Sequence, residues 1–323
     1  MNKKGFIVTV ILFSTLIVVL SILVGIKLAN SGPDDSKKKS DEYIKYSEMF
    51  QLELSSDESY YSILRLYDTS LSSVEVPDTI DNIPVKKLLS HKDSNNFASW
   101  NSCVTIRIGK NVEYIGSDPS NEGVLNGGSL GDNFLSSLSK AAAIIVDEEN
   151  PVYSSKDGVL YNKDFTVLIK YPNNKVDSTE SFNVIIPNTV KTIYHKAFYY
   201  NTKITKVVLG SNVEEIGNLV FAGCEKLTTI SFNNKLKSIG QSAFKDCDLT
   251  SITLPESVES LGDLAFAYND NLDYCYIGEN CKSFGKDIFA DVRDNFTIVT
   301  TSSNLPNLEE VETLKYYKKR SLD

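Results

Sequence analysis

The stretch VEEIGNLVFAGCEKLTTISF, residues 213–232, is followed by LKSIGQSAFKDCDLTSITL, residues 236–254, which keeps the same order of apolar residues. Each stretch carries an Ile-Gly pair, then a Phe, a Cys and an alternating apolar segment. The phenylalanine recurs with gaps of 23, 23, 22 and 23 residues, at Phe198, Phe221, Phe244, Phe266 and Phe289. A fixed period in this range indicates a solenoid, because a unit this short buries its apolar face only by stacking on its neighbours.

The same register extends toward the N-terminus once insertions are allowed. Trp100, Cys103, Ile106 and Ile108 follow Phe97 at the offsets seen in the later units, and Leu138, Ala141, Ile144 and Val146 follow Leu135 in the same way. Phe50, Leu52 and Leu54 alternate ahead of Tyr61 and Ile63, which predicts a hairpin that caps the first unit. We therefore expect a solenoid over residues 43–300, with an N-terminal cap at 43–75 and insertions at 117–133 and 147–183.

Each unit contains a segment of the form Leu-x-x-Ile-x-Leu. Its alternation of apolar and polar residues is typical of a half-buried strand, since successive side chains of a strand point to opposite faces. Stacked units would place these strands about 4.8 Å apart in a parallel sheet. The Phe-x-x-Cys segment predicts a turn. The expected fold is an α/β-type solenoid, mostly short β-strands in one stacked sheet with turns or short helical segments behind it.

The unit resembles the leucine-rich repeats of the BspA-like bacterial surface proteins. The shared features are Ala-Phe at 197–198, 243–244 and 265–266 and Leu-Pro at 254–255. The segments VDEENP at 146–151 and SKDGVLYNKD at 155–164 also resemble the spacer that this family inserts between repeats. The resemblance implies a leucine-rich-repeat solenoid that is exported and that binds a protein or glycan in adhesion or recognition, with no catalysis.

The N-terminus contains 21 uncharged residues at 6–26, preceded by Lys3 and Lys4. A helix of that length spans about 30 Å, the thickness of a bilayer's hydrocarbon core. Because signal peptides usually have apolar stretches of about 7–15 residues, residues 1–29 are expected to be an uncleaved signal anchor, a single transmembrane helix. Cleavage near Ser31, which would give a secreted protein, is the alternative.

The remaining terminal segments are polar. Residues 30–42 are expected to form a flexible tether and residues 301–323 a polar tail. Lysines lie on both sides of the apolar stretch, and the positive-inside rule taken alone would place the repeat domain on the cytoplasmic side. The long domain that follows the stretch and the exported family that it resembles favour an extracytoplasmic repeat domain at the cell membrane.

The charge balance excludes one class of partner. Three of the 33 Lys and Arg residues and none of the 42 Asp and Glu residues lie in the first 30 positions, so the remainder has a net charge near −12. Nucleic-acid binding calls for a basic surface, so no nucleic-acid partner is expected. No nucleophile, base or phosphate-binding loop stands in a catalytic pattern, and we predict no enzyme activity and no cofactor.

The cysteine and histidine residues do not have the spacing typical of metal ligands. Four of the five cysteines occupy repeat positions, and Cys281 falls on the position of Val213. Cys224 and Cys247 lie at equivalent places and are close enough in register for a disulfide, but a column of small buried thiols is the favoured interpretation. The acidic run at 147–149 has oxygen ligands suited to calcium, yet it belongs to the spacer, and no metal site is predicted.

The residue between the two core positions of each expected strand faces outward. These residues form the candidate partner-binding surface, because a solenoid's sheet face is its usual binding surface; in order they are Glu75, Arg107, Ile145, Ile185, Val208, Ser231, Thr253 and Tyr276. Alternatively, the inserted segment at 155–172 folds over or extends the sheet and covers its apolar stripe. A further hypothesis is a structural or assembly component of the cell's own envelope.

Overall fold

The computed structural model describes residues 40–89, 100, 102–116, 138–175, 182–300 and 318–321. Contacts divide the chain into a unit of residues 1–44 and a unit of residues 45–323. The expected anchor at 1–29 and insertion at 117–133, together with Phe97 and Leu135, lie outside the described residues. Among the helices of the described part, none combines the length and the apolar character needed to span a membrane.

The described residues contain one α-helix, α2 (Asp41–Met49). Ser40 caps it, because its Oγ accepts the backbone N–H of Tyr43 at 3.0 Å, and two acidic residues in the first turn favour the positive end of the helix dipole. The tether was expected to reach residue 42 and no helix was predicted after it, so α2 was missed by the sequence analysis. The Ser-Asp-Glu sequence at 40–42 is a recognisable N-cap signal that would have located it.

The predicted capping hairpin is confirmed. β1 (Phe50–Leu54) pairs antiparallel with β2 (Tyr61–Leu66). The same sheet continues through β5 (Ile83–Leu89), which pairs in parallel with β2 and with β7 (Tyr114–Gly116) and antiparallel with β4 (Thr79–Ile80).

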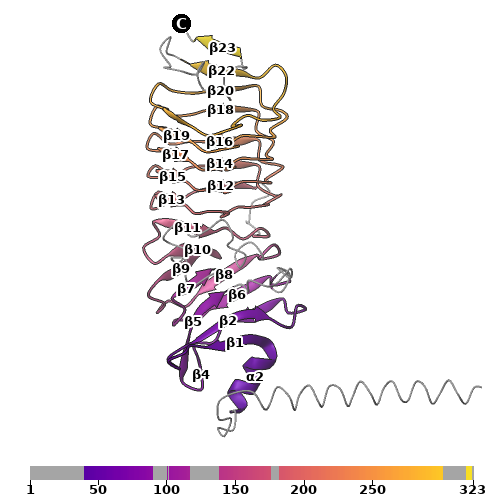
Figure 1. Ribbon diagram of the computed structural model, residues 1–323, viewed down its shortest axis with the longest axis vertical. Helices are drawn as coiled ribbons and strands as arrows, with labels where there is room; N and C mark the ends of the chain where they lie inside the picture. The colour runs from indigo at the N-terminus through magenta and orange to yellow at the C-terminus, as the bar shows by residue number, and fades with distance from the viewer. Residues whose placement is uncertain are drawn as a thin grey trace, which may run out of the picture. The chain divides into compact units, whose positions relative to one another are not determined.

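From this cap onward, unit 45–323 stacks two ladders of short strands (Figure 1). The first ladder comes from the predicted strands and consists of three separate sheets. Their strands are β3 (Ser73–Glu75), β6 (Thr105–Ile108) and β8 (Ala143–Val146); β12 (Asn183–Ile185), β14 (Lys206–Val208) and β16 (Thr229–Ser231); and β18 (Ser251–Thr253), β20 (Tyr274–Tyr276), β22 (Thr297–Thr300) and β23 (Lys318–Ser321).

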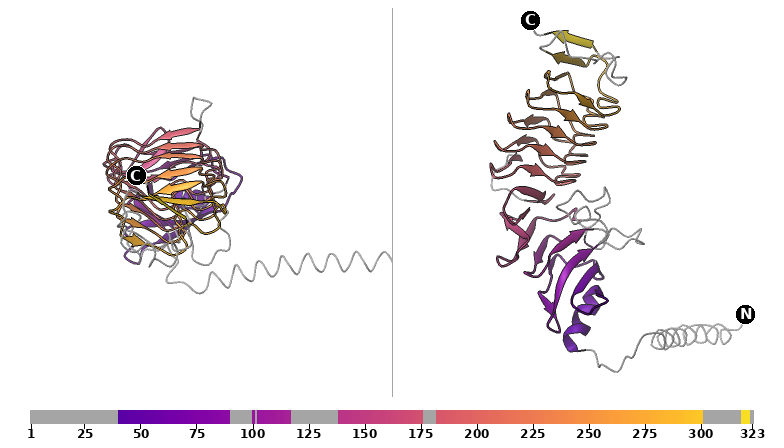
Figure 2. Two further views of the ribbon diagram at one scale, coloured as in Figure 1. Left: turned by 90° about the horizontal axis from the view of Figure 1, so that it is seen from above. Right: turned by 60° about the vertical axis from the view of Figure 1, so that its left-hand side comes forward.

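The second ladder is one eight-stranded sheet on another side of the stack (Figure 2). Five of its strands come from the segments that precede each Phe of the repeat, and the other three come from the inserted segment. Its strands are β9 (Tyr153–Lys156), β10 (Val159–Asn162), β11 (Val167–Lys170), β13 (Thr192–Ile193), β15 (Glu215–Ile216), β17 (Ser238–Ile239), β19 (Ser260–Leu261) and β21 (Ser283–Phe284). The expectation of a single stacked sheet was therefore wrong, because each rung bends twice and forms hydrogen bonds on both sides.

The core is a column of aromatic rings, as the phenylalanine period predicts. Ring centroids of Phe198, Phe221, Phe244 and Phe266 are separated by 4.9, 5.1 and 5.4 Å, and Phe289 follows at 5.7 Å. All five side chains are buried. The column continues beyond the repeats, since Tyr171 stacks 4.8 Å below its first ring and Phe296 lies 4.8 Å from its last.

A third hydrogen-bonded ladder holds the turns that carry these rings. The N–H groups of Leu219, Phe221 and Gly223 donate to carbonyls of the next rung at 2.8–2.9 Å. The residues two before and two after the Phe have positive φ, 56° at Leu219 and 74° at Gly223. Alternation between left-handed and right-handed backbone keeps these N–H groups parallel to the stack axis. Turns rather than helices therefore lie behind the sheets.

The glycine after each Ile allows the rungs to approach closely. A Cβ built on Gly240 would lie only 2.6 Å from the carbonyl carbon of Gly217 in the rung below. A side chain at this position would push adjacent rungs apart.

Within the expected insertion at 147–183, residues 147–175 continue the stack, although they interrupt the sequence repeat. β9 and β10 form one antiparallel pair, β10 and β11 another, and β11 then pairs in parallel with β13. Within the expected polar tail the structure describes β23, which pairs in parallel with β22. An edge strand leaves its N–H and C=O groups without partners, and β23 satisfies those of β22.

Replacing Phe244 with Ala should lower the free energy of unfolding by about 3–5 kcal/mol, the usual cost of truncating a buried aromatic residue. Phe244 is fully buried between two rings, so the change removes two stacking contacts at once. Urea denaturation of the full chain measures this. Phe182→Ala is the matched control, because Phe182 is 42% exposed; equal losses from both variants would contradict the stacked core.

His195 lies in the turn of the first regular rung. Its Nδ1 accepts the N–H of Asn218 at 3.0 Å, and in the next rung Oδ1 of Asn218 accepts the N–H of Gln241 at 2.8 Å. Burial lowers the pKa of His195 below 6.5, with Lys196 lowering it further and Glu215 opposing the shift. The folded state therefore binds fewer protons than the unfolded state just below pH 6.5.

Because of this shift, the stability that His195 contributes should be complete above about pH 6.5 and should decline as the pH falls toward the folded-state pKa. His195→Asn keeps an acceptor of the kind that Asn218 supplies and removes the titrating group. Denaturation midpoints measured between pH 5 and 7.5 should fall less steeply with acid in the variant. Identical slopes for the two proteins would contradict the assignment.

Candidate partner-binding site

The predicted outward-facing residues form three groups rather than one stripe. Glu75, Arg107 and Ile145 are in register on β3, β6 and β8. Ile185, Val208 and Ser231 are in register on β12, β14 and β16. Thr253 and Tyr276 are in register on β18 and β20.

The first group borders a small hollow of about 190 Å³. Glu75 and Arg107 are exposed and Ile145 is half-buried. Asp78 also lines the hollow, but its Oδ1 already accepts the backbone N–H of Lys110 at 2.7 Å. The hollow is therefore a polar depression whose aliphatic member is largely covered.

The second group carries the apolar surface. Ile185 is 75% exposed, the largest value among the large hydrophobic residues that the structure describes as exposed. Val208 beside it is half-buried, and Phe182, just before β12, is 42% exposed. The sequence places an outward-facing aliphatic residue in three consecutive units, at Ile145, Ile185 and Val208. Of these three residues, Ile185 alone is exposed.

The inserted segment does not cover Ile185. Gly158 O accepts the N–H of Ile144 at 2.8 Å, and Ser155 Oγ accepts the N–H of Val146 at 2.9 Å. The β9–β10 hairpin therefore closes the edge of β8, while its strands extend the second ladder. The inserted segment thus covers the apolar stripe near Ile145 and leaves Ile185 exposed.

The third group is more polar. Tyr276 donates its phenol O–H to a carboxylate oxygen of Glu256, and Thr253 is exposed. Between the second and third groups the first ladder is interrupted, since β16 and β18 are not paired. The segment from Cys247 to Leu249, just before β18, is one residue shorter than the segment from Cys224 to Leu227.

Two lysine side chains contact the acidic run at 147–149 and the residue after it. Lys163 Nζ donates to the carbonyls of Glu148 and Asn150 at 3.0 and 2.6 Å, and Lys110 pairs with Glu149 at 3.1 Å. These ammonium groups use oxygens that a cation would need. Within the described ranges, no cluster of three His, Cys, Asp or Glu side chains has the geometry to hold a metal ion.

All five cysteines are buried free thiols. Sγ of Cys224 donates to Phe198 O at 3.3 Å, and Sγ of Cys247 donates to Phe221 O at 3.2 Å. Burial raises the pKa of Cys224 to about 12 and that of Cys247 well above 9, so these thiols are unreactive hydrogen-bond donors. The structure thus has the predicted column of buried thiols.

A second surface escaped the sequence analysis. The residue two positions before the apolar residue of β13, β15, β17, β19 and β21 alternates in charge along the stack, in the order Lys191, Glu214, Lys237, Glu259 and Lys282. Lys237 Nζ lies 2.8 Å from Glu214 Oε2, and this contact lowers the pKa of Glu214 and raises that of Lys237. The alternation is visible in the sequence once the Ile column is aligned.

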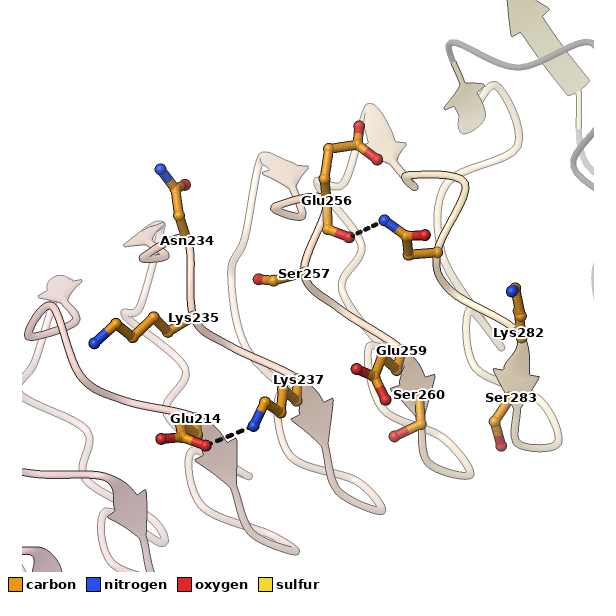
Figure 3. Close-up of a pocket in the computed structure, with 11 residues that line it drawn as sticks. Glu214, Asn234, Lys235, Lys237, Glu256, Ser257, Glu259, Ser260, Lys282 and Ser283 are labelled. Atoms are coloured by element: carbon orange, nitrogen blue, oxygen red, sulfur yellow. Dashed lines mark hydrogen bonds and ion pairs between the residues drawn. The ribbon is translucent and has the colours of Figure 1, made fainter.

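This charged column borders an open groove of about 850 Å³ (Figure 3). Its floor is formed by residues at the starts of β17, β19 and β21, and its wall by the loops that precede them. The lining is polar, and it includes Asn234, Ser257, Ser260, Asn280 and Ser283.

Comparison with known proteins identifies the repeat. Residues 191–316 match the BspA type leucine rich repeat region in six copies. The rungs of this region are BspA-type leucine-rich repeats. Repeats of this type are generally non-catalytic binding scaffolds. No curated protein is similar to the chain in sequence.

Among solved structures, the pneumococcal vaccine antigen PcpA aligns with 79% of this chain and 68% of its own at 21% identity and a TM-score of 0.56, which supports the solenoid fold. A leucine rich cell surface protein from Faecalibacterium prausnitzii A2-165 aligns with 79% of this chain and 96% of its own at 17% identity and a TM-score of 0.37. A leucine-rich repeat protein from Eubacterium ventriosum aligns with 73% of this chain and 61% of its own at 19% identity and a TM-score of 0.40.

Proposed function

We propose that this chain is a bacterial cell-surface protein whose BspA-type repeats bind a protein or glycan partner without catalysing a reaction. The observation that carries the proposal is the exposure of Ile185 on β12, beside Val208 and near Phe182. Ile185 and Phe182 are both exposed large hydrophobic residues, and exposed apolar patches tend to mark interaction sites.

Burial of Ile185 by a partner would contribute favourably to the free energy of binding. Covering apolar surface contributes about 25 cal/mol per Å², so an Ile that is buried only on binding adds appreciably to affinity. The rigid stack holds the patch in place, since β12 is hydrogen-bonded to β14 and Val184 beneath it is buried. Little ordering cost therefore opposes binding.

We also propose that residues 6–26 anchor the protein in the cell membrane, with the repeats outside. The support comes from the sequence, which has 21 uncharged residues at these positions. The acidic balance of the remaining chain fits a partner that is neutral or basic.

Changing Ile185 and Val208 together to Asp should abolish partner capture and leave the fold intact. The added charges destroy the apolar patch but lie on the outer face of the sheet, where Ile185 is 75% exposed. The full-length wild type and variant are immobilised, and the proteins and glycans that each retains from bacterial envelope and host matrix are compared. Loss of the cooperative urea transition in the variant would show instead that the patch belongs to the core.

The matched control is Thr202→Asp with Ser211→Asp. It adds the same charge at two exposed positions off the sheet face. The proposal requires that this control retain every partner that the wild type retains. If the Ile185 variant also retains them all, the patch is not the binding site.

The anchor proposal is checked by sequencing the N-terminus of the protein from fractionated cells. An anchored protein should retain Met1 and sediment with membranes, because residues 6–26 stay in the bilayer. Soluble protein in the medium that begins near Ser31 or Gly32 would instead indicate cleavage and secretion.

A further inference from the structure

The groove on the second ladder has the size of a ligand site and lies away from the Ile185 patch. Its volume of about 850 Å³ falls within the range of roughly 300–1,000 Å³ typical of small-ligand sites. It crosses the rungs of β17, β19 and β21, with loop residues Asn234 and Glu256 along one side (Figure 3).

Several polar side chains in the groove are not committed to other residues. Glu214 and Lys237 pair with each other at 2.8 Å. Within the part of the chain that the structure describes, Glu259 and Lys282 form no ion pair, and the hydroxyls of Ser260 and Ser283 form no hydrogen bond. The groove therefore offers a carboxylate, an ammonium group and hydroxyls to a ligand.

These groups repeat with the rungs. Ser260 and Ser283, which line the groove, are in register on adjacent parallel strands, so their hydroxyls are about 4.8 Å apart along the stack. Ser238 holds the same register position on β17, just outside the lining. A ligand that matches a polar surface with this repeat is a polymer whose own polar groups recur at a similar interval. An extended β-1,4-linked hexose chain advances by nearly this distance per sugar.

The lining also restricts the charge of the ligand. Three Lys and three Glu residues line the groove, and their signs alternate along the ladder, so a polymer of one charge would meet repulsion at every second rung. Hydroxyl groups, which both donate and accept, can bond with either charge. The scarcity of apolar side chains in the lining disfavours an apolar peptide.

We propose that this groove binds an extended, neutral polysaccharide chain that lies along the stack axis. The inference rests on the proposed binding function and assigns it a second site with a glycan ligand. Glu259 and Lys282 are the principal charged contacts, and Ser260 and Ser283 bond with successive sugars.

Titration calorimetry of the full-length protein with hexasaccharides tests the ligand class. Cellohexaose, an extended β-1,4-linked chain, should bind saturably. Maltohexaose contains the same sugar in an α-linked, curved chain and should bind at least about tenfold more weakly, the loss of one or two well-placed hydrogen bonds. Equal affinity for both, or no saturable binding of cellohexaose, would overturn the proposal.

The site is tested by Glu259→Gln with Lys282→Met, which should weaken cellohexaose binding at least about tenfold, since hydrogen bonds to charged groups are the stronger ones. Glu225→Gln with Lys226→Met is the matched control, because both residues are exposed on a turn outside the groove. This control should bind as the wild type does. Equal affinity in the groove variant and the wild type would refute the site.

Failure here and failure of the proposed function are distinguishable. If the Ile185 variant loses its partners while cellohexaose fails to bind the wild type, the binding function stands and the glycan groove does not. If cellohexaose binds and the groove variant loses it, the groove stands whatever the Ile185 variant shows.

Discussion

Contact between successive aromatic rings is the interaction on which the rest of this structure depends. Each ring from Phe198 to Phe289 lies 4.9–5.7 Å from the next, close to the strand spacing of about 4.8 Å. Rungs can therefore form hydrogen bonds on every side without opening a gap in the core. Because no single rung buries its own ring, stability accrues between neighbours, as expected of a solenoid.

A fixed core spacing aligns the surface as well. Once rungs repeat at one interval, equivalent exposed residues form columns, and the pair Glu214 and Lys237 comes within 2.8 Å although the two are 23 residues apart. The pair is exposed, so it contributes little to stability. Its importance is that it belongs to the alternation of charge along the second ladder, which sets the charge pattern of the groove.

The sequence predicts the core of this fold well because the core depends on a pattern repeated five times. The rings, the first-ladder strands and the position of Cys281 in the core follow from it. The capping hairpin follows instead from the local alternation of Phe50, Leu52 and Leu54. Local geometry was harder to predict. Within the regular repeats the second ladder has two-residue strands such as β15, which are too short for alternation to reveal. The positive φ at Leu219 has no glycine to signal it. Whether Ile185 is exposed depends on where the β9–β10 hairpin packs, and the period of the repeat does not predict that packing.

The single 22-residue rung shows which of these constraints is strongest. With one residue fewer between Cys247 and Leu249, the first ladder breaks between β16 and β18, yet β17 still pairs with β19 and Phe244 still stacks on Phe266 at 5.4 Å. Asn269 compensates locally, because its Oδ1 accepts the N–H of Leu249 at 3.1 Å. The shorter rung thus interrupts the first ladder and not the second, and the face of the first ladder divides into short segments. A compact partner suits such a segment, whereas the unbroken second ladder can present a continuous surface to a long polymer.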